Sequence, residues 1–556
     1  MGNNNSSSSP QNKNQNLQQN YIQPQLNQQN YIQPQLNEQN YPVSEPTKIN
    51  NDDEPIDQNF IKLGDGKNKQ KYNLEKGLSL DVKTLHKHFQ FSSSTNQSIP
   101  VMVSVKTLDK TEDAPKGDQE AVKQESLENR PNLDLICVID NSGSMSGEKI
   151  QNVKKTLEYL LELLGDNDRL CLILFNSYAT RLCHLMKTNN SNKPAFKEII
   201  NKIYSTGGTD INSGMELAFR VLKDRKYQNP VSSVFLLSDG QDGSADLRVR
   251  QSLERHLPQE CFTIHSFGFG SDHDGPLMNK ICSLKDGNFY YVEKINQVDE
   301  FFVDALGGLF SVVAQEIVID VELFLHSQYK KFFQNATVSK TYGDMWSVIK
   351  KDTSYRIQIN QLLSGVSKDF IFEINIPANK VDKLEDFERN AEIVKATVSA
   401  IPVDPTYTTK VVKDNNLVLT LFTQNEKVAE DSEINDSVEL NYLRVKASEA
   451  MDQAMKEAEQ QKYESGQQIL QSMIERFDKS HPKNKEKLQI IKKDLEECQQ
   501  NAKPRVYENE GKFRMLKNMN ANLKQQSRAV EQCDMYQNCA QKEMVSKAKA
   551  KKGSFW

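Results

Sequence analysis

Apolar strands that alternate with amphipathic helices between residues 133 and 315 constrain the fold of this chain most strongly. The strand-like runs lie at 133–139, 170–176, 231–237, 261–267 and 289–292. Helical patterns lie between and after them, at 148–164, 193–204, 212–223, 245–257 and 297–314. Because strands that are buried on both faces consist of near-continuous apolar runs, this alternation predicts an α/β domain with a doubly wound, mostly parallel sheet.

Five oxygen-bearing side chains lie where these strands and helices meet. Asp140, Ser142 and Ser144 follow the first strand in one tight turn, Thr209 precedes a helix, and Asp239 ends the strand at 231–237. Open α/β sheets bind ligands at the carboxyl ends of their strands, so we expect these side chains at one edge. Two carboxylates and three hydroxyls, without Cys or His, suit a small hard cation. Mg²⁺ fits most naturally, with Ca²⁺ or Mn²⁺ as alternatives.

The order of three motifs, Asp-x-Ser-Gly-Ser, Gly-Gly-Thr-Asp and Ser-Asp-Gly, resembles the von Willebrand factor type A domain, which has a Rossmann-like α/β fold. The resemblance implies a metal-ion-dependent adhesion site. It implies that Ser142, Ser144 and Thr209 bind the metal directly, and that Asp140 and Asp239 bind it directly or through water. It also implies that an Asp or Glu of a protein partner completes the coordination sphere.

Strand patterns flank this domain, which we place at residues 133–315. Residues 78–130 and 316–430 carry period-two or apolar runs typical of antiparallel sheets. We therefore expect a β-sandwich into which the α/β domain is inserted, or which follows it. Helical periodicity covers residues 437–545, with a hairpin broken near Ser465-Gly466 and further helices at 485–502 and about 510–541.

This domain order, over residues 78–477, is similar to that of plant ubiquitin ligases that carry a type A domain. The matching stretches begin at Arg130 (Arg-Pro-Asn-Leu-Asp-Leu), Leu164 (Leu-Gly-Asp-Asn-Asp-Arg-Leu) and Phe267 (Phe-Gly-Phe-Gly-Ser-Asp-His-Asp). Those ligases have a Cys/His zinc module ahead of the domain, whereas no cysteine precedes Cys137 here. Ubiquitin transfer is therefore not expected.

The first 60 residues are rich in Asn, Gln and Ser, and a ten-residue unit that starts at Asn20 repeats from Asn30. Such a tract buries too little apolar surface to offset its ordering entropy, so we predict disorder; a Tyr-Ile-Gln-Pro docking motif is the alternative. The start, from Met1 through Gly2 to Ser6, fits the N-myristoylation pattern. One acyl chain at Gly2 without a polybasic cluster gives only weak, reversible membrane contact.

Composition excludes several classes of protein. The net charge of −5 gives no basic footprint for nucleic acid. A signal-peptide core and an apolar stretch of bilayer length are both lacking, and the eight cysteines are scattered without Cys-x-x-Cys pairs. These features predict a cytoplasmic protein that does not span a membrane.

Two other motifs offer alternative chemistry. The run from Gly143 to Gly147 fits the Gly-x-Ser-x-Gly motif of hydrolases, with Ser146 as nucleophile and His265 or His273 as candidate base. That hypothesis leaves the five oxygen side chains unexplained. Asp272-His273-Asp274 resembles a second metal motif, but loop packing is favoured.

The sequence favours a protein without enzymatic activity, a scaffold that presents Mg²⁺ to an acidic side chain of a protein partner. The alternative is a substrate-recognition or regulatory subunit of an enzyme complex, such as a ubiquitin ligase. A serine hydrolase that uses Ser146 is a minor alternative.

Overall fold

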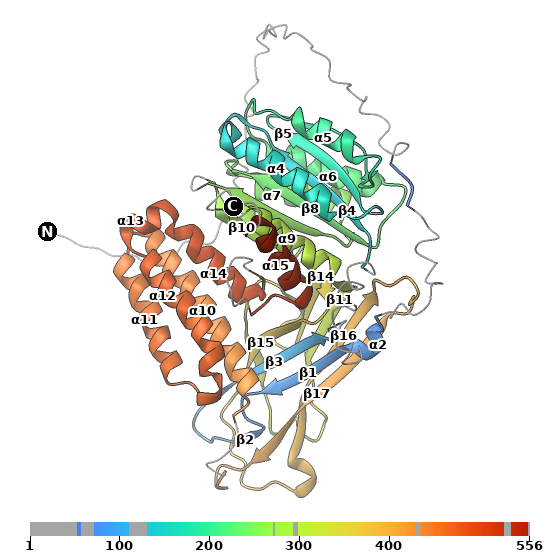
Figure 1. The fold of residues 1–556 in the computed structure, drawn as a ribbon. Coiled ribbons are helices and arrows are strands. Elements are labelled where there is room, and N and C mark those ends of the chain that lie inside the picture. The colour runs from blue at the N-terminus through green and yellow to red at the C-terminus, as the bar shows by residue number, and fades with distance from the viewer. Residues whose placement is uncertain are drawn as a thin grey trace, which may run out of the picture. The chain divides into compact units, whose positions relative to one another are not determined.

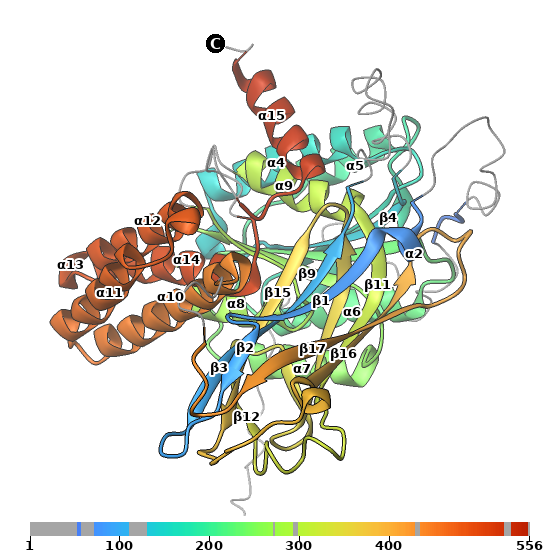
Figure 2. The same ribbon diagram turned by 90° about the horizontal axis from the view of Figure 1, so that it is seen from below.

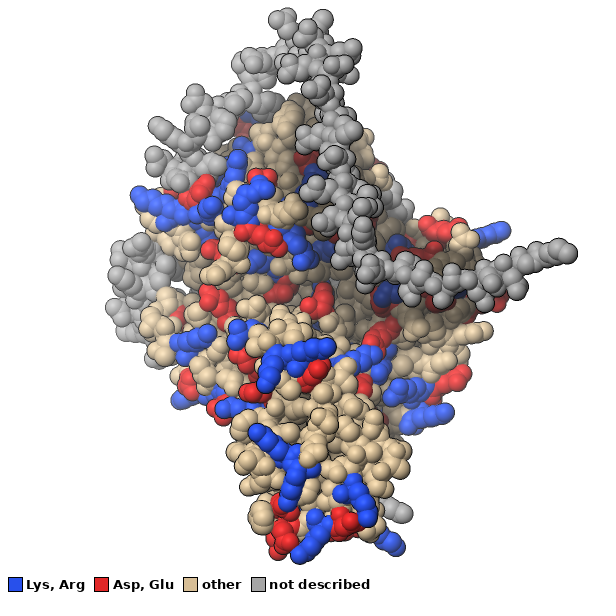
Figure 3. Space-filling view, turned by 180° about the vertical axis from the view of Figure 1, so that it is seen from behind, with Lys and Arg blue, Asp and Glu red and all other residues tan. Residues whose placement is uncertain are grey.

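The computed structural model describes residues 53–56, 72–109, 130–270, 273–292, 298–428, 434–527 and 535–553. The strands within these ranges form three sheets, which Figure 1 shows with their helices. No helix in the described ranges is long and apolar enough to cross a lipid bilayer. On the face drawn in Figure 3, basic and acidic side chains are interspersed, and neither sign gathers into a separate field.

A seven-stranded sheet forms the centre of the α/β domain, in the order β10-β9-β8-β4-β5-β6, with β7 paired to β5. The strands from β10 to β5 are parallel, and the short β6 and β7 run antiparallel to β5. Their bounds are β4 (Leu133–Asp140), β5 (Arg169–Phe175), β6 (Ala179–Arg181), β7 (Met186–Lys187), β8 (Val231–Ser238), β9 (Thr263–Phe269) and β10 (Phe289–Val292).

Helices cover both faces of this sheet (Figures 1 and 2). One apolar core joins the sheet to α4 (Glu148–Leu163), α5 (Lys193–Asn201) and α9 (Val298–Phe310). The other joins it to α6 (Ile211–Asp224), α7 (Ala245–His256) and α8 (Gly275–Ser283). Strands β4 and β8 are buried along their whole length, as their apolar runs predict. The predicted doubly wound, mostly parallel sheet is confirmed.

One helix of this domain was not predicted, and one predicted helix was too long. Helix α8 lies beyond a loop and was not expected, although Asp274 caps it by accepting a hydrogen bond from Leu277 N and a proline stands in its first turn. The helix predicted over 297–314 ends at Phe310. The next residues enter strand β11, because Val312 pairs with Leu363 and β-branched residues fit a pleated sheet well.

Two further sheets enclose a common apolar core and form a β-sandwich. The first has the order β1-β3-β15-β12 and the second β13-β14-β11-β16-β17-β2. Helix α2 (Leu74–Gly77) precedes β1. The strands are β1 (Leu78–Thr84), β2 (His88–Gln90), β3 (Gln97–Thr107), β11 (Val312–Leu323), β12 (Thr337–Thr341), β13 (Trp346–Lys350), β14 (Ser354–Leu363), β15 (Ser367–Ile376), β16 (Asn390–Pro402) and β17 (Val411–Phe422).

Strand pairing shows that the α/β domain is inserted into this sandwich. Strand β3 comes before the domain and β15 comes after it, yet they pair antiparallel from Lys106 with Ser367 to Gln97 with Ile376. One sheet is therefore built from chain segments on both sides of the domain. This settles the choice between insertion and succession that the sequence left open.

The C-terminal region is helical. Helices α10 (Asp436–Glu459), α11 (Tyr463–Asp478), α12 (Lys485–Asn501) and α14 (Lys512–Lys524) share an apolar cluster, and the short α13 (Pro504–Val506) connects two of them. The hairpin breaks at Gln461, where φ is 61°, and not at Ser465-Gly466 as predicted. Gly466 lies in the first turn of α11, where a Cβ atom would be 2.9 Å from Ala454 O. The glycine thus permits close packing of α10 and α11 and does not make the turn.

Residues 510–541 do not form one helix as predicted. Helix α14 ends at Lys524, and Gln525 takes the left-handed conformation with φ 52°. Helix α15 (Cys539–Gly553) lies beside α9 in Figures 1 and 2 and contributes Met544 and Val545 to the core of the α/β domain.

The prediction of disorder for residues 1–60 was wrong for residues 53–56. These four residues lie against the α/β domain, where Glu54 N donates to Leu185 O at 3.0 Å. Their acidic side chains find specific partners there, which a composition argument cannot foresee. The remainder of the predicted tail, with the repeat and Gly2, lies outside the described residues.

Candidate metal centre

Asp140 stands at the carboxyl end of β4 and organises the turn that follows. Its Oδ1 accepts a hydrogen bond from Ser142 N at 2.8 Å, and its Oδ2 accepts one from Ser238 Oγ at 2.5 Å. A short 3-10 turn (Gly143–Met145) follows, with Met145 fully buried beneath it. Gly147, with φ 75°, then leads the chain into α4.

Asp239 reaches the same place from β8. Strands β4 and β8 are parallel neighbours with Ile139 opposite Leu237, so their carboxyl ends coincide. Ser144 Oγ lies 3.0 Å from Asp239 Oδ1, to which it donates, and 3.0 Å from Ser142 Oγ. Four of the five predicted side chains therefore form one hydrogen-bonded cluster.

Thr209 lies in the loop that borders this cluster. Gly143 N donates to Gly207 O at 3.1 Å, which ties the loop to the first turn. On the other side of Thr209, Asp210 N donates to Asn176 O at 2.6 Å and so binds the end of β5. Gly207 has φ 78°, a conformation that favours glycine. This conformation occurs where Gly207 O accepts the hydrogen bond from Gly143 N.

The two carboxylates of the cluster are buried. Asp140 and Asp239 are 0% and 1% exposed. Burial raises the pKa of Asp140 to about 6; the nearby Asp239 adds to this rise, while hydrogen bonds from Ser142 and Ser238 oppose it. Lys149 Nζ lies 2.9 Å from Asp239 Oδ2 and supplies one positive charge against the two carboxylates.

This donor set fits a hard divalent cation. Ionised carboxylates are costly to bury unless a cation neutralises them, and the single ammonium of Lys149 leaves one negative charge unmatched. The serine and threonine hydroxyls add neutral oxygen donors of the kind that Mg²⁺ and Ca²⁺ accept. In the described ranges, no group of three or more His, Cys, Asp or Glu side chains is placed to hold a metal, so this centre would depend on its hydroxyls as well as its two carboxylates.

The structure gives the hydrolase alternative no support. Ser146 is exposed after the 3-10 turn, whereas His265 is buried in β9 and accepts a hydrogen bond from Asn288 N at 3.2 Å. His273 Nδ1 contacts Gly270 O at 2.5 Å, and its ring stacks on Phe513 of α14 with centroids 4.7 Å apart. The two candidate bases thus make packing contacts of their own. In the proposed second metal motif, Asp274 caps α8, and Asp272 lies outside the described residues.

Three further residues of the site were not predicted from the sequence. Lys149 and Ser238 bind the two carboxylates, and Asn141 Nδ2 holds the loop by donating to Tyr204 O at 3.0 Å. A lysine in the first turn of a helix opposes the helix dipole, and this misplaced charge was the signal that could have drawn attention to Lys149.

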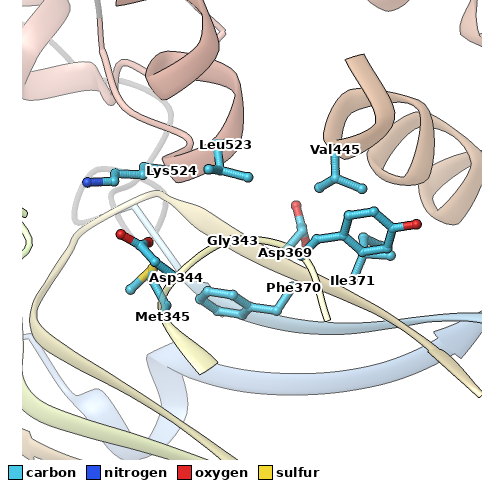
Figure 4. Close-up of a pocket in the computed structure, with 10 residues that line it drawn as sticks. Gly343, Asp344, Met345, Asp369, Phe370, Ile371, Val445, Leu523 and Lys524 are labelled. Carbon is cyan, nitrogen blue, oxygen red and sulfur yellow. The ribbon is translucent and has the colours of Figure 1, made fainter. Parts of the chain in front are cut away.

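A cavity elsewhere is too small for an organic ligand. It lies where the β-sandwich meets α10 and α14, lined by Asp369, Val445 and Lys524 among others (Figure 4). Its volume of about 10 Å³ holds no more than one water molecule. The metal centre therefore remains the better candidate site.

Comparisons with known proteins agree with the α/β fold of residues 134–304. The family model of the von Willebrand factor type A domain matches residues 134–304. An uncharacterized protein of Synechocystis, sll0103, is 29% identical over 173 residues, which make up 31% of this chain and 40% of that protein. The E3 ubiquitin-protein ligase WAV3 of Arabidopsis thaliana is 25% identical over 257 residues, 45% of this chain and 32% of the ligase. The matches thus span less than half the length of these two relatives.

The fold similarity extends beyond the α/β domain. A solved structure, von Willebrand factor type A from Catenulispora acidiphila, aligns with a TM-score of 0.56 at 12% identity. The alignment covers 81% of this chain and 96% of that one. At this identity the likeness concerns the fold alone.

Proposed function

Residues 134–304 form a von Willebrand factor type A domain, and we propose that the chain is a metal-ion-dependent protein-binding scaffold. The observation that carries the proposal is the hydrogen-bonded cluster of Asp140, Ser142, Ser144 and Asp239 at the carboxyl edge of the sheet. With Thr209 from the adjoining loop, these side chains would hold Mg²⁺, or Ca²⁺ or Mn²⁺ in its place. The bound ion would supply a Lewis-acidic position for an oxygen ligand from outside the chain.

The occupant of that position is an acidic side chain of a protein partner. A carboxylate is a hard anionic ligand and matches a hard cation. The exposed surface around the site favours a protein over a free small acid. In the described part of residues 134–304, three large hydrophobic side chains are exposed: Tyr178, Tyr204 and Leu247.

All three of these side chains lie on segments near the carboxyl ends of the parallel strands, as the metal centre does. Tyr178 follows the carboxyl end of β5, Tyr204 belongs to the Thr209 loop, and Leu247 lies in the first turn of α7, after Asp239. Exposed aromatic groups around a polar centre are typical of protein interfaces, where they supply most of the binding energy. We name Tyr178, Tyr204 and Leu247 the apolar rim.

A second candidate is a recognition subunit within an enzyme complex such as a ubiquitin ligase. It is favoured by the match to WAV3, which covers 45% of this chain. The metal centre would then select the substrate, and another protein would perform the transfer. Co-purification of a ligase with the full chain would distinguish this candidate from a scaffold without enzymatic partners.

We also propose a cytoplasmic location, with weak and reversible membrane contact if Gly2 is acylated. Gly2 lies outside the described residues, so this part of the proposal depends on the sequence pattern alone.

The test is affinity capture from a cell lysate by the full chain, with Mg²⁺ or with EDTA. We expect one set of proteins to be lost both on chelation and in the double variant Ser142→Ala, Ser144→Ala. Ser146→Ala removes a nearby hydroxyl outside the site and should retain every partner. If the same proteins persist through chelation and in the double variant, binding lies elsewhere on the chain.

A further inference from the structure

Residues 53–56 of the chain contact the α/β domain at residues other than those of the metal centre. The segment accepts hydrogen bonds from Arg169, the first residue of β5, and from Arg181 of β6. It also accepts them from the backbone N–H groups of Leu185 and Lys187. Arg169 is the first residue of β5, and Arg181 pairs with Ile173 within that strand, whereas the metal centre lies at the carboxyl ends of β4 and β8. We name these donor groups the second site, which residues 53–56 fill in the structure.

The carboxylate of Asp53 accepts hydrogen bonds from one side chain and from the backbone. Arg181 donates to Asp53 Oδ1 at 2.8 Å, and Leu185 N donates to the same oxygen at 3.2 Å. Asp53 is 8% exposed, so its carboxylate is nearly removed from water. A charge-assisted hydrogen bond of this kind is stronger than one between neutral groups.

Glu54 is held at both its backbone and its carboxylate. Its N–H donates to Leu185 O at 3.0 Å, and its carbonyl accepts from Arg169 at 2.8 Å. Its Oε2 accepts from Lys187 N at 2.9 Å, and its Oε1 accepts from Asn192 Nδ2 at 2.8 Å. These contacts therefore involve the backbone of Glu54 and two successive acidic side chains.

The site is held in shape by groups other than its occupant. The Arg169 guanidinium is fully buried and pairs with both oxygens of Asp134, at 2.8 and 2.7 Å. It also donates to Tyr227 O. Because these contacts fix Arg169 without residues 53–56, the donor to Glu54 would stay in place after the segment left.

The fit of the segment is incomplete, which favours exchange. Asp53 Oδ2 is buried without a hydrogen-bond partner among the described residues, and an unmatched buried oxygen weakens binding. Pro55 is exposed and Ile56 is only partly buried. Recognition is thus concentrated in the Asp-Glu pair.

We propose that this part of the α/β domain is a metal-independent binding site for a peptide segment with an Asp-Glu pair. Residues 53–56 occupy it in the resting chain, and an equivalent acidic segment of a protein partner occupies it when they leave. The site does not depend on the proposed metal-dependent function, since it shares no ligand residue with the metal centre.

The test uses a fluorescein-labelled peptide of residues 50–58 and the full chain, followed by fluorescence anisotropy. In the chain with Asp53→Ala and Glu54→Ala, we expect saturable binding with a Kd on the order of 10–100 μM. The wild-type chain should bind at least about tenfold more weakly, because its own tethered segment competes at a high effective concentration. A peptide with Asn and Gln at positions 53 and 54 should not bind.

Further variants locate the site. Adding Arg181→Ala to the chain with Asp53→Ala and Glu54→Ala should weaken peptide binding by about tenfold or more. Arg250→Ala alters an exposed arginine on α7 and should leave peptide binding unchanged. EDTA should have no effect. Absence of peptide binding up to about 1 mM, indifference to Arg181→Ala, or loss of binding in EDTA would each overturn the proposal.

Thermal melting checks that the chain with Asp53→Ala and Glu54→Ala still folds. Asp53→Asn with Glu54→Gln serves as a milder second variant. Loss of cooperative melting in both variants would show that the segment is an inseparable part of the fold, and the proposal would then be wrong.

Discussion

The ammonium group of Lys149 lies 2.9 Å from one oxygen of Asp239, while the other oxygen of that carboxylate accepts a hydrogen bond from Ser144. Lys149 stands in the first turn of α4, where a positive charge opposes the helix dipole. The ion pair with Asp239 therefore explains why a lysine stands at position 149, whereas the helix dipole does not. A divalent ion held by Asp239 and its neighbours would meet this fixed positive charge.

Replacing Lys149 by Met is expected to tighten Mg²⁺ binding about three- to tenfold, because the like charge beside the ion is removed. Isothermal titration of the full chain measures the change. Lys155→Met, which alters an exposed lysine of the same helix, is the control and should leave the Kd unchanged. Weaker binding in Lys149→Met would instead mean that the ammonium orients Asp239 for the ion.

Mg²⁺ should stabilise the wild-type chain against thermal unfolding. A ligand that binds only the folded state at ten times its Kd raises the free energy of unfolding by about 1.4 kcal/mol. Thr209→Ala should reduce this gain by weakening Mg²⁺ binding, whereas Thr206→Ala changes an exposed threonine of the same loop and should retain it. Identical melting of the wild type in Mg²⁺ and in EDTA would contradict a functional metal centre.

The parts of this molecule that the sequence predicts are those set by local patterns. Asp140, Ser142 and Ser144 follow an apolar strand directly, so their turn and its place at the sheet edge could be expected. Asp239 ends a similar strand. Parallel neighbours bring such ends together, although the sequence alone does not give the order of the strands.

The unpredicted parts depend on contacts between distant residues. Lys149 meets Asp239 across 90 positions, and Arg181 meets Asp53 across 128, so no local pattern indicates either pair. The break between α10 and α11 was misplaced because glycine usually marks a turn. Here Gly466 instead allows α10 and α11 to pack closely.

Stability should fall between pH 7 and pH 5 partly because of His265. Burial lowers its pKa to about 3, whereas in the unfolded chain the ordinary value is 6.5. Below pH 6.5 the unfolded chain therefore binds a proton that the folded chain does not, so acidification favours unfolding. The contribution lost by pH 5 is about 2 kcal/mol.

Chemical denaturation of the wild type and of His265→Asn at pH 7 and pH 5 measures this contribution. The variant should be less stable at pH 7, because it loses the ring contacts with Phe235, but less sensitive to pH. Asp140, whose raised pKa acts in the opposite direction, is common to both chains and cancels in the comparison. Equal pH sensitivity would show that the buried histidine is not responsible.

Gly2→Ala tests the lipid anchor that the N-terminal pattern predicts. If Gly2 is acylated, part of the wild type should sediment with membranes, and the variant should be found entirely in the supernatant, because one acyl chain binds membranes only weakly. Metabolic labelling with a myristate analogue provides an independent measurement. A wild type that carries no label and never sediments would remove the anchor from the proposal.

The apolar rim should set partner affinity without affecting the metal. Tyr178 and Tyr204 are 67% and 54% exposed, and neither supplies an oxygen donor to the metal centre, so truncating either removes contact area and leaves the donors in place. For a partner captured in Mg²⁺ and released by EDTA, Tyr178→Ala or Tyr204→Ala should weaken binding about tenfold or more, as for an interface hot spot. The Kd for Mg²⁺ should not change. Phe387→Ala removes an equally exposed ring outside the α/β domain and serves as the control. Full partner affinity in both tyrosine variants would show that Tyr178 and Tyr204 do not contribute to partner binding.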